Sequence, residues 1–285
     1  RFTPQWAFDF MARHGVTHTF LTPTALKRMA AMASPHADWP DLRLRAIGTG
    51  GEPCPSAVLE WGKQVLQVPI NEFYGLTEVN HLVGNCQRLY PARPGSMGRA
   101  YPGHQMAVLD EQGAPVPAEQ MGQIAAHRSD PTLFLGYWKQ PERTAAMFLG
   151  DWVLTGDYGH VDADGYFWYH GRDDDLIKSG GYRIGPAEVE DCLVTHPAVA
   201  EAAVVASPDA ARGHIVKAFV RLRDAIQPTP ALSRELQELV KTRLAVYKYP
   251  REIEYVSAFE MTSSGKINRK LLRAAEEQRK GNAAA

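Results

Sequence analysis

Length, composition and charge narrow the classes of protein to which this chain can belong. It has 285 residues, of which 45% are hydrophobic and 22% charged, and its formal net charge is −1. Such a composition is typical of a globular protein with a sizeable core, and the length suffices for two domains. The near-neutral charge argues against nucleic acid or an acidic membrane surface as the main partner, because both favour a basic excess.

Cysteine spacing and hydropathy exclude two further classes. The cysteines, Cys54, Cys86 and Cys192, lie far apart and form no CxxC pair, so they indicate neither a disulfide framework nor a zinc site. No apolar run reaches membrane-spanning length, and the amino terminus has no signal-peptide pattern. We therefore expect a cytoplasmic protein without a membrane span. Because Arg1 is not a start methionine, we also expect further sequence before it.

The first part of the chain alternates between the two apolar periodicities. Helices are predicted from Pro4, from Pro23 and over 55–66, and strands at 16–21, 42–47 and 68–73. This alternation predicts a parallel sheet whose strand ends carry ligand loops. The alternating part spans residues 1–94 and forms the α/β region of a large first domain.

Residues 95–173 are expected to complete that first domain as an antiparallel β subdomain. Four short strands are predicted, at 105–109, 123–127, 152–155 and 166–170, separated by Gly- and Asp-containing turns. The predicted class is thus α/β in a mixed α+β sense.

Residues 174–285 are predicted to form a small mobile α/β domain. A helix opens at Pro186, strands follow at 199–206 and 215–222, and Ser233 caps part of the next helix. A strand near 253–256 and a helix from Asn268 close the chain. We expect the Ala/Glu/Lys-rich tail after Arg273 to fray.

Five short segments carry the candidate chemistry, although most of them are also ordinary turn or capping sequences. The run 171–185 is the least ordinary, because it holds three carboxylates, two arginines, one lysine and four glycines in fifteen residues. The segments are Gly50-Gly51-Glu52-Pro53, Tyr74-Gly75-Leu76-Thr77-Glu78, Thr155-Gly156-Asp157, the run from Gly171, and Ser263-Ser264-Gly265-Lys266.

Two simpler assignments fail. A phosphate-binding P-loop at Lys266 would need glycine at 260 and serine or threonine at 267, where this chain has Glu260 and Ile267. A metal site in the aspartate run 173–175 is disfavoured, since adjacent carboxylates point in different directions and no EF-hand spacing surrounds them.

Taken in order, the five segments resemble the adenylate-forming (AMP-dependent synthetase/ligase) superfamily, in its acyl-CoA synthetase branch. The resemblance runs from about residue 15 to 273 and is strongest at YGLTE (74–78), GRDDDLIKSGGYRIGPAEVE (171–190) and SSGKINRKLLR (263–273). It implies that ATP, with Mg²⁺, activates a carboxylic acid as an acyl-adenylate, which then passes to coenzyme A as co-substrate.

The resemblance also implies which residues bind the base of the nucleotide. Gly51, Glu52 and Pro53 match the segment that borders adenine, where small residues allow close backbone approach. Tyr74 matches the aromatic residue that stacks on the purine. Tyr169 matches a side chain that packs near the base.

Ribose and phosphate contacts are implied in the same way. Asp157 matches the carboxylate that accepts the ribose hydroxyls, and Arg172 a second ribose contact. Thr77 matches a hydroxyl donor to the α-phosphate, and Glu78 the carboxylate that holds Mg²⁺ through hard oxygen atoms. Arg183 matches a cation near the phosphate.

Four further positions are implied to act in the reaction. Lys266 matches the lysine that bridges the attacking carboxylate and the phosphate, and Asp174 matches the hinge about which the small domain rotates. Gly181 matches the wall of the thiol tunnel. At Gly75, acetate-specific members of the family tend to carry tryptophan, so glycine implies an acid larger than acetate.

One feature of the family is missing from this chain. Members are longer and carry a Ser/Thr/Gly-rich phosphate loop upstream, and no comparable segment occurs in these 285 residues. We therefore expect a carboxyl-terminal portion, whose activity without the upstream half is left open. Two alternatives also stay open: an adenylation domain that delivers to a carrier protein, and a catalytically dead binding module. Whether the protein forms a homodimer is also left open.

Overall fold

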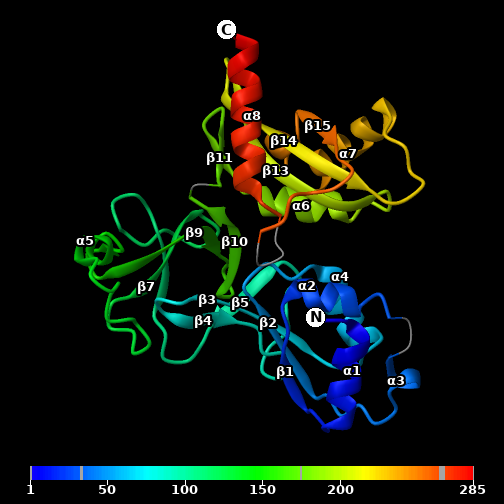
Figure 1. Cartoon of the computed structure of the whole chain (residues 1–285). Coiled ribbons are helices and arrows are strands. Elements are labelled where there is room, and N and C mark those ends of the chain that lie inside the picture. Colours follow the sequence, from blue (N-terminus) through cyan, green and yellow to red (C-terminus); the bar gives the residue numbers. More distant parts are fainter. Residues whose placement is uncertain (1, 33–34, 174, 263–266, 285) are drawn as a thin grey trace. The chain divides into compact units, whose positions relative to one another are not determined.

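The computed structural model describes residues 2–32, 35–173, 175–262 and 267–284 (Figure 1). The chain divides into two compact units, Arg1–Tyr169 and His170–Ala285. Asp174 and Lys266, the hinge residue and the bridging lysine of the sequence analysis, lie outside the described residues. The domain boundary at 173–174 stays a prediction.

Local capping signals explain where the first helices begin. Thr3 Oγ1 accepts a hydrogen bond from the Trp6 amide at 3.2 Å, and Thr22 Oγ1 accepts one from the Ala25 amide at 3.3 Å. A proline follows each threonine at the first helical position, where its missing N–H costs nothing. The helices of this unit are α1 (Pro4–Arg13), α2 (Pro23–Met29), α3 (Pro35–Asp38), α4 (Ser56–Gln64) and α5 (Pro141–Ala145).

The first unit is built on one large sheet. Across it the strands follow the order β1 (His18–Phe20), β2 (Ala46–Gly50), β3 (Ile70–Leu76), β4 (Asn80–Gly84), β5 (Ser96–Ala100), β10 (Tyr166–Arg172), β9 (Trp152–Val161), β7 (Gly122–His127) and β6 (Met106–Leu109), with β8 (Phe148–Leu149) beside β9. The pairs β1–β2 and β2–β3 are parallel, which confirms the predicted parallel region, and β4 pairs antiparallel with β3. The antiparallel strands therefore continue the same sheet.

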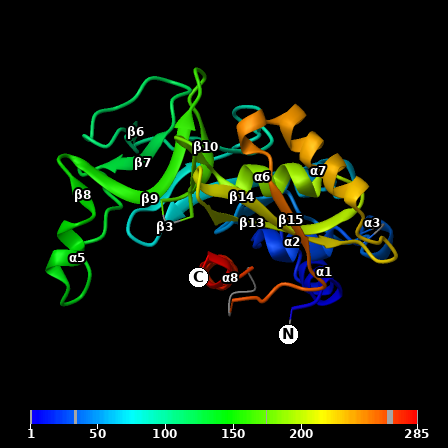
Figure 2. The same ribbon diagram turned by 90° about the horizontal axis from the view of Figure 1, so that it is seen from above.

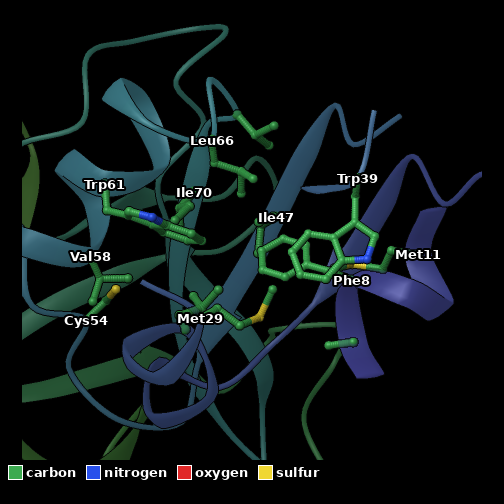
Figure 3. Packing of buried hydrophobic residues seen from close by; sticks show 13 residues of the cluster. Phe8, Met11, Met29, Trp39, Ile47, Cys54, Val58, Trp61, Leu66 and Ile70 are labelled. Carbon is green, nitrogen blue, oxygen red and sulfur yellow. The ribbon is translucent and has the colours of Figure 1, made fainter. Parts of the chain in front are cut away.

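A hydrophobic core fills the space between the parallel strands and helices α1, α2 and α4 (Figure 3). The rings of Phe8 and Trp39 stack with centroids 4.7 Å apart, and the Trp39 indole N–H donates to Asp9 at 2.6 Å. Trp61 of α4 and Ile70 of β3 belong to the same cluster. Each large apolar side chain buried in this way contributes about 1.5–3 kcal/mol, so this core holds the strand ends that carry the candidate site.

The second unit is a five-stranded sheet with helices on both faces. The strand order is β12 (Tyr182–Ile184), β11 (Ile177–Ser179), β14 (Gly213–Leu222) and β13 (Val199–Asp209), with β15 (Glu252–Tyr255) beside β14. Helices α6 (Pro186–Val194) and α7 (Pro230–Arg243) lie on one face and α8 (Arg269–Ala284) on the other (Figure 2). A 3₁₀ turn, Val246–Lys248, follows α7. The predicted α/β class is confirmed.

Two expectations for this unit were wrong. The cap of α7 is Thr229, whose Oγ1 accepts from the Leu232 amide at 3.1 Å, whereas Ser233 lies one turn inside the helix. Helix α8 also continues to Ala284 and does not fray after Arg273. The physical reason is Glu276, which is buried and lies 3.0 Å from the Lys217 ammonium.

Candidate functional site

The structure brings together two residues that are 83 positions apart. Tyr74, near the end of β3, donates its hydroxyl to Asp157 Oδ2 at 2.7 Å, and both side chains are half-buried. Asp157 lies at an irregularity in the pairing of β9 with β7. Ala125 of β7 pairs with Leu154, and Gln123 pairs with Tyr158, so three residues of β9 lie opposite one residue of β7. The extra residues of β9 form a bulge that contains Asp157.

Each residue of the Thr155-Gly156-Asp157 motif has a part in that bulge. Thr155 Oγ1 donates to the Ile124 carbonyl at 2.7 Å and accepts from the Asp157 amide at 3.2 Å. Gly156 has φ of +78°, a left-handed conformation that favours glycine. The motif therefore fixes the Asp157 backbone against the sheet.

Electrostatics keep the Tyr74 hydroxyl protonated. Burial raises the pKa of Tyr74 well above its ordinary value, and the neighbouring Asp157 carboxylate raises it further. The nearby Tyr169 phenol acts in the same direction. The structure thus places Tyr74, Asp157 and Tyr169 in one cluster that combines flat rings, a neutral donor and a carboxylate.

The segment Thr77–Val79 forms the turn between β3 and β4, so a helix cap, the simple alternative for the YGLTE motif, is wrong. The Val79 amide donates to the Leu76 carbonyl at 3.1 Å. Thr77 is exposed, and Glu78 is half-buried with Oε1 accepting from the Tyr137 hydroxyl. This hydrogen bond, followed by burial, raises the pKa of Tyr137.

Close backbone approach explains the glycine at position 75. A Cβ atom there would lie 1.8 Å from the Asn80 carbonyl oxygen and 2.9 Å from the His81 Cα. In this backbone a side chain at 75 requires strand β4 to move. The link between Gly75 and acid size stays a prediction, and the structure gives the glycine a second explanation.

The Gly51-Glu52-Pro53 segment lies in the connection from β2 to α4, as expected for a strand-to-helix turn. Gly51 has φ of +87°. Glu52 Oε1 accepts two hydrogen bonds from Thr24, from its amide at 2.9 Å and from its hydroxyl at 2.6 Å. These bonds tie the segment to the start of α2.

The remaining described candidates belong to the second unit. Arg172 ends β10 and is exposed, and Arg183 is half-buried in β12. Gly180 and Gly181 form the two-residue turn between β11 and β12, with φ of +55° and +85°. Such a turn requires two left-handed residues, which explains the glycine pair. A Cβ on Gly181 would meet no heavy atom within 4 Å, so the space beside it is open.

Sequence reasoning missed two contacts that hold the site. Thr24 fixes Glu52 from 28 positions away, and Tyr137 fixes Glu78 from 59 positions away. The only local signal was the position of Thr24 at a predicted helix start; nothing local marks Tyr137.

The chemistry of these donors fits a magnesium nucleotide. Glu78 offers a hard carboxylate in which one oxygen accepts the Tyr137 hydrogen bond. Within the described residues, no group of three or more His, Cys, Asp or Glu side chains converges on a metal position. A magnesium ion held by one carboxylate usually completes its octahedral coordination with water and phosphate oxygens.

Two family models match this chain. Residues 1–138 match the family model for the AMP-binding enzyme, and residues 188–266 match that for the AMP-binding enzyme C-terminal domain. The chain belongs to the AMP-binding enzyme family. No helix of the described part is long and apolar enough to cross a membrane.

Individual relatives are acyl-activating proteins. The chain is 42% identical over 283 residues to the uncharacterized acyl-CoA ligase YtcI of Bacillus subtilis (strain 168), covering 99% of this chain and 53% of YtcI. It is 38% identical to the acetyl-coenzyme A synthetase of the same organism, covering 97% of this chain and 49% of the relative. The chain thus spans about half the length of these curated relatives.

A solved structure shares the fold. The crystal structure of the anthranilate CoA ligase AuaEII in complex with anthranoyl-AMP matches with a TM-score of 0.84 and 34% identity. The match covers 98% of this chain and 53% of AuaEII.

Proposed function

We propose that this chain is the carboxyl-terminal part of an AMP-forming acyl-CoA synthetase, an acid–thiol ligase. The whole enzyme would activate a carboxylic acid with ATP as an acyl-adenylate and then transfer the acyl group to coenzyme A. The observation that carries the proposal is the hydrogen bond from Tyr74 to Asp157, which joins two residues implied to bind one nucleoside. The family membership and the ligase relatives support it.

In this proposal the Tyr74–Asp157 cluster binds the nucleoside. Because the Tyr74 hydroxyl stays protonated, it donates to one oxygen of Asp157 and leaves the carboxylate charged as an acceptor for the ribose hydroxyls. The Tyr74 ring would stack on adenine, with Tyr169 beside it. Arg172 would supply the second ribose contact.

Acid activation gathers negative charge, so cations and oriented donors should dominate the catalysis. Thr77 would donate its hydroxyl to the α-phosphate, and Glu78 would hold Mg²⁺, whose charge offsets that of the phosphate oxygens. Arg183 and Lys266 would add fixed positive charge. One cation about 4 Å from an anion contributes on the order of 4 kcal/mol at a moderate effective dielectric.

The second half-reaction would use the small domain. Rotation about Asp174 would bring the turn at Gly181 to the thiol, where its open space suits a pantetheine chain. The substrate proposed is an acid larger than acetate, on the strength of Gly75 alone.

ATP–pyrophosphate exchange tests the proposal. It would be measured for the chain, and for the chain with any sequence that precedes it in its gene, against acetate, butyrate, octanoate and benzoate. We expect exchange with acids larger than acetate, and a thioester when coenzyme A is added. Exchange without thioester would favour delivery to a carrier protein. Absence of exchange in the longest form would favour a binding module and contradict the proposal.

A further inference from the structure

The segment 130–137, which follows β7, makes three contacts with the turn at Thr77–Val79. Thr132 Oγ1 lies 2.7 Å from the Val79 carbonyl oxygen, and the Phe134 amide donates to the Glu78 carbonyl at 2.7 Å. The Tyr137 hydroxyl donates to Glu78 Oε1. Both the backbone and the side chain of Glu78 are therefore held by this one segment.

The amino-terminal end of segment 130–137 is fixed by a buried carboxylate. The Asp130 side chain is 0% exposed and lies 2.7 Å from His104 Nδ1. Asp130 Oδ1 also accepts from the Thr132 amide at 2.9 Å. Since a buried carboxylate with several partners is costly to displace, Thr132 is a fixed support for the turn.

The ring of Tyr137 is held independently of its hydroxyl. Its backbone amide donates to Thr144 Oγ1 at 2.9 Å, and the Phe134 ring meets it edge-on with centroids 5.0 Å apart. The Arg143 guanidinium lies over the ring, 4.1 Å from its centroid. Phenylalanine at position 137 would retain all three contacts and lose the interactions of the hydroxyl, which are the hydrogen bond to Glu78 and a weaker one with the Arg143 side chain.

We propose that Tyr137 is a positioning residue for Glu78, an inference that rests on the proposed function. A half-buried glutamate without a fixed partner samples several rotamers, and ordering them on binding costs free energy. The Tyr137 hydroxyl occupies Oε1 and restricts the carboxylate before the magnesium nucleotide arrives, leaving the other oxygen for the ion. Residues that orient metal-binding carboxylates in this way typically change metal affinity or activity 10–100-fold when removed.

The test compares Tyr137→Phe with Tyr90→Phe. Tyr90 is a matched control because it is also half-buried and donates its hydroxyl to a carbonyl, that of Gly84 at 2.6 Å. Calorimetric titration would measure AMP without metal and ATP with Mg²⁺, and thermal unfolding would measure stability. We expect Tyr137→Phe to weaken Mg²⁺·ATP binding about 10-fold or more, with AMP binding and the unliganded melting temperature unchanged.

The outcomes separate this inference from the proposed function. Normal AMP binding with wild-type Mg²⁺·ATP affinity in Tyr137→Phe would overturn the role of Tyr137 alone. Absence of nucleotide binding by the wild type would overturn both. If Tyr137→Phe lowers stability, the double variant with Glu78→Gln decides the question. A loss of Mg²⁺·ATP affinity in the double variant that is no larger than in Glu78→Gln supports positioning through Glu78. Losses of affinity that add contradict it.

Discussion

The two units hold their carboxylates by different means. In the first, the carboxylates of Asp157 and Glu78 each accept a hydrogen bond from a neutral tyrosine that lies far away in the chain. In the second, the Lys217 ammonium is 4% exposed and meets the buried Glu276 carboxylate, which anchors helix α8 to the sheet. A tyrosine partner leaves the carboxylate charge available to a ligand. In an ion pair the cation offsets that charge, and the pair stabilises the fold instead. The difference predicts which substitutions affect binding and which affect folding.

The largest effect on stability is expected from Lys217→Met. This change leaves the Glu276 carboxylate buried with less compensation, and breaking a buried pair typically costs about 3–5 kcal/mol. Urea denaturation would measure the loss in free energy of unfolding. Lys241→Met, which removes a helical pair with the exposed Glu238, is the control and should cost less than about 1 kcal/mol. Equal effects of the two substitutions would show that burial of the pair is unimportant.

An effect on binding, with little on stability, is expected from Asp157→Asn. The amide keeps the shape of the side chain but loses the charge that accepts ribose hydroxyls. A hydrogen bond to a charged group contributes about 1.5–3 kcal/mol, so AMP affinity should fall roughly 10–100-fold. Tyr74→Phe, which keeps the ring, should weaken AMP binding less than Asp157→Asn does. Titration calorimetry of both variants checks the order, and a larger loss in Tyr74→Phe would contradict it.

A smaller effect on the free energy of unfolding is expected when the Asp130 carboxylate is protonated at low pH. Burial alone would raise its pKa, but hydrogen bonds from Thr132 and His104 outweigh burial and hold the pKa below the ordinary value. The stabilisation is therefore present above the ordinary carboxyl pKa of about 3.9 and is lost as pH falls through the lower folded value. In Asp130→Asn the free energy of unfolding should fall less steeply below pH about 4. A slope identical to that of the wild type would exclude this carboxyl as the cause.

Local signals account for what could be predicted from the sequence. Helices α1 and α2 begin at Thr-Pro pairs, so their starts depend only on neighbouring residues. Strand β4 was missed because its residues gain strand structure by pairing with β3 and β5. The cap at Thr229 was misplaced by one turn, since Ser233 is also a capping residue type.

The candidate site was also predictable only in part from the sequence. Motif resemblance named Tyr74 and Asp157 separately, but the bulge at Thr155–Gly156 that lets them meet depends on the register of β9 against β7. Tyr137 carries no local signal, because its contact with Glu78 exists only once the strands are paired. Long-range hydrogen bonds of this kind follow from tertiary structure and not from residue type.

The central claim, acid activation followed by thiol transfer, is tested most directly by Lys266→Ala in the complete enzyme. Its two half-reactions would be measured separately: ATP–pyrophosphate exchange, and thioester formation from a preformed acyl-adenylate and coenzyme A. The account predicts that exchange is largely lost while thioester formation from the preformed adenylate continues. Exchange that survives the substitution undiminished would contradict it.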